Sequence, residues 1–387
     1  MSENKKIITK KDWVSNFTLI GKPVINDNTF KIEERKEGSN WIYNSLFLGV
    51  DCGEKYGVVH AEMMGGYDCE KNNVIYAFGK DENDSTDFDT KLEVAWEDRF
   101  DEDILDSVGE LSFITVGLEK TDKDKTYYKN FLSAYDAIAY IKEHLNGDMV
   151  VNVKGKLKYT MYQDTVQVRK NITSIVLSKV DDSSKYISKF TQTILIDKDS
   201  ASLKNIDKDK GVMYVDAKVL DYLKDYNGIE VKGQYPYNKQ FEYQMDFSNE
   251  DLCKKIVTKL FKVKKNYTQI TFDGELIESG ATVAVTLDDV PDEIKELIGV
   301  VFTEEEALEK CSSNGNKEYR MLLRKPTVKL EGEDKIPVLQ KFEERYTEDD
   351  LYLDYLYKNK NETDDSEDVD DANETESLDS LDWLDKL

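Results

Sequence analysis

The sequence predicts a mainly β protein with short helices, built as two barrels in tandem and followed by a disordered acidic tail. Segments in which apolar and polar residues alternate recur along the chain, and each half contains one helix followed by two strands. The composition then changes, because residues 359–376 are almost entirely Asn, Asp, Glu, Ser and Thr. The 387 residues suffice for two or three domains with apolar cores.

Residues 147–178 are predicted to form two strands joined by a tight turn. Between Val151 and Tyr162 apolar side chains alternate with polar ones, which is typical of a half-buried strand. Gly155 interrupts the apolar set and indicates a bend or a close approach of another backbone segment. The two strands concentrate positive charge in a chain of net charge −26, on five side chains: Lys154, Lys156, Lys158, Arg169 and Lys170.

This segment, GDMVVNVKGKLKYTMYQDTVQVRKNITSIVL, resembles the last two strands of the oligonucleotide-binding (OB) fold in bacterial-type single-stranded DNA-binding proteins. The preceding SAYDAIAYIKEHL resembles the short helix of that family, and VSNFTLIG near the N-terminus resembles its opening strand. The resemblance covers roughly residues 13–178 in the correct order. Tandem modules on a chain of this length look more like a bacteriophage version. The resemblance implies an OB barrel that binds single-stranded DNA.

The chain is expected to divide into five parts. Residues 1–12 are a flexible arm, and residues 13–180 are an OB-fold domain with an acidic insertion near 79–106. The insertion contains 12 acidic and three basic residues. Residues 190–345 are a second OB-like domain with a C-terminal extension, an expectation that depends on element order alone. Residues 346–358 form a short helix, and residues 359–387 are a disordered acidic tail with an apolar tip.

The predicted binding residues are aromatic and basic. Trp41, Tyr43 and Phe47 share one face of a strand opposite an aliphatic stripe, and aromatic rings of this kind stack on bases without sequence preference. Alternatively, these rings are core residues beneath the acidic insertion. With Tyr159 and Tyr162 they are expected to stack on bases, while Lys154, Lys156, Lys158, Arg169 and Lys170 bind phosphates.

A second basic run follows the helix that begins near Ser248. It is either a further phosphate-contacting surface or an ordinary solvated helix face. Its members are Lys254, Lys255, Lys259, Lys262, Lys264 and Lys265.

The acidic tail ends in an apolar tip, which suggests a peptide that docks in a groove of a partner protein. The family resemblance implies a flexible acidic linker whose tip recruits replication and repair enzymes and competes with DNA for the basic groove. The tip lacks the Ile-Pro-Phe end of the bacterial motif and carries Lys386. Alternatively, the tail serves only solubility. The predicted partner-binding residues are Leu378, Leu381, Trp383, Leu384 and Leu387.

The sequence shows no pattern that predicts an enzyme. It contains no phosphate-binding loop and no nucleophile elbow, and its four Cys and two His residues are too scattered for a metal site, so no cofactor or metal is expected. The N-terminus lacks the apolar run of a signal peptide, and no stretch is apolar enough to span a bilayer, so a cytoplasmic location is expected.

The expected function is sequence-nonspecific binding of single-stranded DNA in phage DNA replication, recombination and repair. Two alternatives remain open. The acidic body predicts a protein-interaction or DNA-mimicking module on an OB scaffold. An RNA-binding protein of similar fold is the other, because stacking on a base does not read the sugar.

Overall fold

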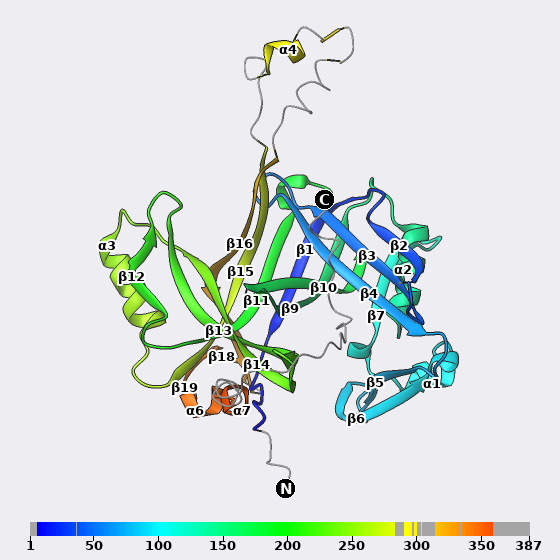
Figure 1. Cartoon of the computed structure of the whole chain (residues 1–387), viewed down its shortest axis with the longest axis horizontal. Helices are drawn as coiled ribbons and strands as arrows, with labels where there is room; N and C mark the ends of the chain where they lie inside the picture. Colours follow the sequence, from blue (N-terminus) through cyan, green and yellow to red (C-terminus); the bar gives the residue numbers. More distant parts are fainter. Residues whose placement is uncertain are drawn as a thin grey trace, which may run out of the picture.

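The computed structural model describes residues 6–35, 37–163, 165–282, 290–295, 298–299, 303, 314–332 and 334–358. The predicted disordered tail and its apolar tip lie outside these residues. Two five-stranded barrels lie side by side, the first half of the chain forming one and the second half the other (Figure 1). No helix within the described part is long and apolar enough to cross a bilayer.

The first barrel has the strand order of an OB fold. Around the ring the order is β1, β3, β4, β10, β9 and back to β1, and only the β4–β10 contact is parallel. Helix α2 (Ala134–His144), capped by the Ser133 hydroxyl, lies between the third and fourth strands and buries one face against the core. The five strands are β1 (Ser15–Val24), β3 (Trp41–Asp51), β4 (Val58–Asp68), β9 (Val151–Tyr162) and β10 (Thr165–Leu177).

The second barrel repeats this order. The ring runs β11, β13, β14, β16, β15 and back to β11, again with one parallel contact, between β14 and β16. Helix α3 (Glu250–Ile256) and a π-helical turn (Val257–Phe261) occupy the place of α2. The prediction of a mainly β fold with OB barrels is therefore confirmed. The strands are β11 (Ile187–Ile196), β13 (Val212–Tyr226), β14 (Ile229–Gln244), β15 (Tyr267–Thr282) and β16 (Asn314–Pro326).

The first strands of the two barrels join them. Strands β1 and β11 pair antiparallel, with Phe17 opposite Phe190. Each ring packs over a glycine of its own barrel, since Phe17 is the register partner of Gly155 on β9 and Phe190 that of Gly274 on β15. The barrels are therefore related by an approximate twofold axis that passes between the two phenylalanines.

Each barrel extends a hairpin onto the other. The β9–β10 hairpin reaches the second barrel, where the Tyr159 backbone N–H donates to the Asp221 carboxylate at 2.8 Å. The β15–β16 hairpin reaches the first barrel, where the Glu278 backbone N–H donates to the Tyr56 carbonyl at 2.9 Å. We call this second hairpin the β15–β16 arm. These reciprocal contacts hold the barrels together beyond the β1–β11 pairing.

Short elements surround the barrels. The acidic insertion forms a hairpin with its own two-stranded sheet, from β5 (Val74–Lys80) and β6 (Thr86–Ala95), followed by α1 (Glu102–Ser107). The other short elements are β2 (Phe30–Arg35), η1 (Trp96–Asp98), η2 (Glu110–Ser112), β7 (Ile114–Lys120), β8 (Thr126–Phe131), η3 (Ser183–Lys185), β12 (Ala201–Asp207), α4 (Asp292–Lys295), β17 (Val328–Glu331) and β18 (Ile336–Leu339).

Both ends of the described chain differ from prediction. The expected helix at 346–358 is two helical turns, α6 (Glu348–Leu351) and α7 (Tyr355–Lys358), separated by extended backbone and preceded by β19 (Lys341–Tyr346). The arm expected to be flexible is anchored in its described part, because Ile8 is only 3% exposed. Part of the outer face of the second barrel is apolar, and these end segments bury it in one cluster: Ile8, Leu195, Leu220, Val231, Tyr267, Tyr346, Leu351, Leu353 and Leu356.

Candidate nucleic-acid interface

The outer face of β9 carries the predicted basic row. Val153 and Leu157 point into the barrel and are buried, while Lys154, Lys156 and Lys158 are exposed between them. Residues two apart on a strand project from the same face about 7 Å from one another. Partial burial and the nearby Lys158 ammonium lower the pKa of Lys156, as expected where positive charges are crowded.

Lys156 and Lys158 are held by contacts with neighbouring elements. The Lys156 Nζ donates to Asn16 Oδ1 on β1 at 2.9 Å. The Lys158 Nζ lies 3.5 Å from the Asp221 carboxylate, which Lys10 also approaches at 3.4 Å. The N-terminal arm therefore adds a cation beside the row, which sequence reasoning missed because nothing in the local pattern around Lys10 marks it.

One cross-strand row joins the basic strand to the aromatic one. Lys156 on β9 is the register partner of Asn171 on β10, Asn171 that of Glu62 on β4, and Glu62 that of Phe47 on β3. Directly opposed residues project from the same side of a sheet. The basic and aromatic residues therefore share one continuous outer surface of the barrel, four strands wide.

The aromatic part of this surface lies on β3. Trp41 is 43% exposed and is therefore not a core residue beneath the insertion. Tyr43 lies across from Gly66 on β4, where any larger residue would collide, because a Cβ there would be 2.8 Å from the Tyr43 Cα. Phe47 is half-buried and stacks on His60, with ring centroids 5.1 Å apart. The three rings therefore project from one face of β3.

Two predicted site residues are not available to a ligand. Tyr159 is 1% exposed and its hydroxyl donates to Gln192 Oε1 at 3.0 Å, so it is a core residue between the barrels. The Lys170 side chain is 11% exposed and its Nζ lies 2.5 Å from Glu278 Oε1, so it pairs with the β15–β16 arm. Both predictions were wrong because these residues have the parity of their buried neighbours, Leu157 and Ile172.

Arg169 and Tyr162 remain at the surface. Arg169 Nε lies 3.9 Å from Glu62 Oε1, so the two side chains form a long ion pair at the surface. Tyr162 is 37% exposed and ends β9 at the tip of its hairpin. Burial raises the pKa of Glu62, although the charges of Arg169 and Lys170 oppose the shift. Sequence reasoning missed Glu62 and His60, whose outward parity on β4 could have revealed them.

Two of the described positions of β15 that are equivalent to the basic row carry acids instead. With Gly155 and Gly274 as equivalent positions, Lys154 and Lys156 correspond to Asp273 and Glu275 on β15. Glu275 is already paired, since its carboxylate lies 2.6 Å from the Lys55 Nζ. The equivalent strand face is therefore acidic, and the two barrels differ in the charge of this surface.

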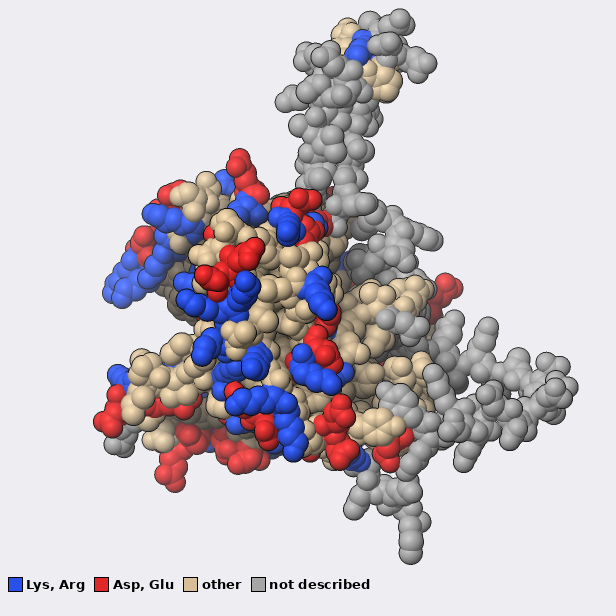
Figure 2. Space-filling model, turned by 90° about the vertical axis from the view of Figure 1, so that its left-hand side faces the viewer, with Lys and Arg blue, Asp and Glu red and all other residues tan. Residues whose placement is uncertain are grey.

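The six lysines of the second basic run are exposed on α3, the π turn and the residues after it. Lys254 lies 3.5 Å from Glu250 on the same helix. Figure 1 places α3 at the opposite end of the molecule from β3 and β4. Figure 2 shows this end, where Lys and Arg side chains gather with Asp and Glu among them. The structure therefore does not bring this run together with the first-barrel surface.

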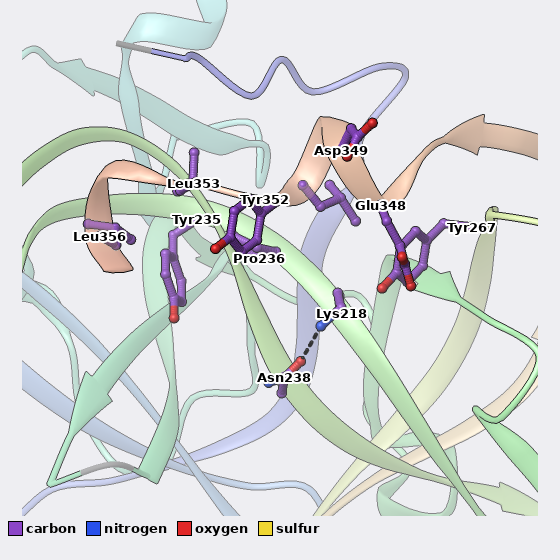
Figure 3. A pocket seen from close by; sticks show the side chains of 11 residues that line it. Lys218, Tyr235, Pro236, Asn238, Tyr267, Glu348, Asp349, Tyr352, Leu353 and Leu356 are labelled. Carbon is purple, nitrogen blue, oxygen red and sulfur yellow. Dashed lines mark hydrogen bonds between the residues drawn. The ribbon is translucent and has the colours of Figure 1, made fainter. Parts of the chain in front are cut away.

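The C-terminal helical turns cover part of the second barrel and leave a groove of about 320 Å³ beside them (Figure 3). Lys218 lies at its floor and donates to Asn238 Oδ1 at 2.7 Å. Glu348 and Asp349 at the start of α6 make its rim acidic. On β13 and β14, the strands equivalent to β3 and β4, the outer face is thus partly occupied by the chain itself.

Two crystal structures of the single-stranded DNA binding protein from Thermus aquaticus are similar to this chain. A deletion variant matches with 10% identity and a TM-score of 0.30, over 69% of this chain and 88% of that one. The wild-type structure matches with 8% identity and a TM-score of 0.30, over 70% and 87%. No protein-family model and no curated protein matches the sequence. The OB assignment rests on the strand pairings of the two barrels.

Proposed function

We propose that this protein binds single-stranded DNA without sequence preference on the outer surface of its first barrel. The observation that carries the proposal is the cross-strand row from Lys156 through Asn171 and Glu62 to Phe47, which joins cations and aromatic rings on one surface. Non-specific binding of single strands needs this combination, because cations bind phosphates and rings stack on bases.

Each part of the surface has a defined role in the proposal. Lys154, Lys156, Lys158 and Arg169 bind phosphates, and Trp41, Tyr43, Phe47 and Tyr162 stack on bases. Stacking contributes about 1–3 kcal/mol per base and is available to every base, which accounts for the lack of sequence preference. An acidic body does not prevent this, because salt screens charges over about 8 Å and local contacts dominate.

The biological role proposed is that of a phage single-stranded DNA-binding protein in replication, recombination and repair, acting without catalysis. The acidic residues 361–387 would compete with DNA for the basic surface and recruit partner proteins through Leu378, Leu381, Trp383, Leu384 and Leu387. Deleting residues 361–387 should then tighten DNA binding and abolish partner capture. Recovery of the same replication proteins with and without the tail would contradict the recruiting role.

Titration of intrinsic Trp fluorescence with a poly-dT oligonucleotide tests the binding proposal. The expected result is fluorescence quenching that saturates, with an affinity that falls steeply as salt is added. Trp41→Phe should remove most of this quenching while the affinity for DNA is largely kept, because a ring remains to stack on the base. Matched RNA strands as competitors separate DNA from RNA binding. No binding to any single strand would contradict the proposal and favour the protein-interaction alternative.

A further inference from the structure

An exposed aromatic residue of the second barrel lies beside the first-barrel surface. Tyr319 on β16 is 65% exposed. Its register partner on β15 is Glu278, the residue whose backbone N–H contacts the Tyr56 carbonyl of the first barrel. Directly opposed residues of an antiparallel pair project from one face with Cβ atoms about 5 Å apart. Tyr319 therefore projects from the side of the β15–β16 arm that faces the first barrel.

The contacts of Glu278 connect this position to the aromatic residues on β3. One Glu278 carboxylate oxygen accepts the His60 backbone N–H at 2.9 Å and lies 3.2 Å from the His60 Nδ1. The His60 ring in turn stacks on Phe47. A chain of neighbouring residues therefore leads from β3 across β4 to the arm: Phe47, His60, Glu278 and Tyr319.

The charge at this junction does not repel a nucleic acid strand. The second carboxylate oxygen of Glu278 lies 2.5 Å from the Lys170 Nζ, and both side chains are largely buried. The buried pair has no net charge, so Glu278 does not place an unpaired carboxylate beside Tyr319.

We propose that Tyr319 stacks on a base of the DNA strand bound to the first barrel, so that the β15–β16 arm of the second barrel completes the binding surface. This inference rests on the proposed function and extends it. Although its β15 is acidic where β9 is basic, the second barrel contributes through its arm. The two barrels would then bind one strand jointly, with a site longer than one OB barrel provides.

The test compares Tyr319→Ala and Tyr319→Phe with the wild-type full chain, using a fluorescein-labelled dT oligonucleotide of about 30 nucleotides, longer than the roughly 4–16 of one OB fold. Tyr319→Ala should weaken binding about 5- to 150-fold, the equivalent of one stacked base. Tyr319→Phe should bind within about twofold of wild type, because the ring is retained. Tyr76→Ala is the matched control, since Tyr76 is 74% exposed on the acidic hairpin.

Crosslinking with an oligonucleotide that contains 5-iododeoxyuridine gives a second readout, which should identify a peptide containing Tyr319. Wild-type affinity for Tyr319→Ala, together with weak binding by Trp41→Ala, would overturn this inference and leave the proposed function intact. Failure of the wild-type protein to bind any oligonucleotide would overturn both. Unchanged thermal unfolding of Tyr319→Ala shows that the variant is folded.

Discussion

Phe17 and Phe190 are opposed on neighbouring strands at the junction of the two barrels, each ring over a glycine of its own barrel. Both rings are 2% exposed, and the two positions are equivalent in the two OB folds. Each phenylalanine ring lies directly against its glycine, so neither glycine position has room for a side chain. In both barrels the Phe–Gly pair is therefore a packing requirement of the junction.

Replacing either glycine should destabilise the protein. A Cβ at Gly155 would lie 1.9 Å from the Asn171 carbonyl oxygen, and one at Gly274 would lie 2.3 Å from the Phe190 ring. Gly155→Ala and Gly274→Ala should each lower the free energy of unfolding by about 1–3 kcal/mol or more, because the barrel wall must shift. Denaturant unfolding measures this, with Gly147→Ala as the control, because a Cβ at Gly147 would meet no atom closer than 3.9 Å. A fully stable Gly155→Ala would contradict the packing argument.

Glu62→Gln should strengthen DNA binding. Glu62 is the one acid in the cross-strand row and lies beside Arg169, so its neutralisation removes a repulsive charge and releases the guanidinium. We expect affinity to rise roughly three- to tenfold at low salt. Because burial raises the pKa of Glu62, wild-type affinity should also rise as the pH falls toward this pKa, and the variant should lack that rise. Equal or weaker binding by the variant would argue against DNA on this row.

Lys156→Gln should change the salt dependence of binding. Each phosphate contact on a single strand contributes about 0.7 to the slope of log K against log salt, so the variant should lose about that amount. Lys125→Gln, on the exposed β7–β8 turn, is the control and should keep the wild-type slope. An oligonucleotide titration across several salt concentrations gives both slopes. Identical slopes for the two variants would remove Lys156 from the proposed site.

Glu278→Gln should destabilise the protein in a pH-dependent way. Burial alone would raise the pKa of Glu278, but the hydrogen bond from His60 and the charge of Lys170 outweigh it and lower the pKa. A lowered pKa means that the wild-type carboxylate stabilises the fold above its unfolded pKa of about 4.5 and loses this effect as pH falls through the folded value. The variant should be about 3 kcal/mol less stable at pH 7, because Lys170 is left buried and unpaired.

Thermal or denaturant unfolding at several pH values measures the difference, which should shrink below pH 4.5. The matched control is the double variant Glu278→Gln with Lys170→Met. Removing the buried cation should restore part of the stability that Glu278→Gln loses. A constant difference at all pH values would show that the variant perturbs packing and not charge.

Much of the first barrel could be predicted from the sequence. Alternation along β9 placed Val153 and Leu157 inside and the lysines between them outside, because successive side chains of a strand point to opposite faces. The helix 134–144 has a Ser133 cap and apolar residues at helical spacing, and both features are visible in the sequence. Local pattern determines these features because they depend on neighbours within a few residues.

The predictions for Tyr159 and Lys170 were wrong because they weighed charge and aromatic character above parity. Parity alone would have placed both side chains inside. Tyr159 has the parity of Leu157, and the barrel buries it on Gln192. Lys170 has the parity of Ile172, and a carboxylate from the other half of the chain makes its burial tolerable. That carboxylate, Glu278, is distant in sequence, and the residues around Lys170 give no indication of this partner.

The sequence by itself determined the strands of the first barrel, its helix, the outward basic row on β9 and the aromatic face of β3. Tertiary structure alone decided that Lys156 and Phe47 share one surface, that Phe17 meets Phe190, and that the β15–β16 arm lies beside the first barrel. The physical reason is that strand pairing and barrel closure join residues far apart in the chain, whereas periodicity reports only which side of its own strand a residue occupies.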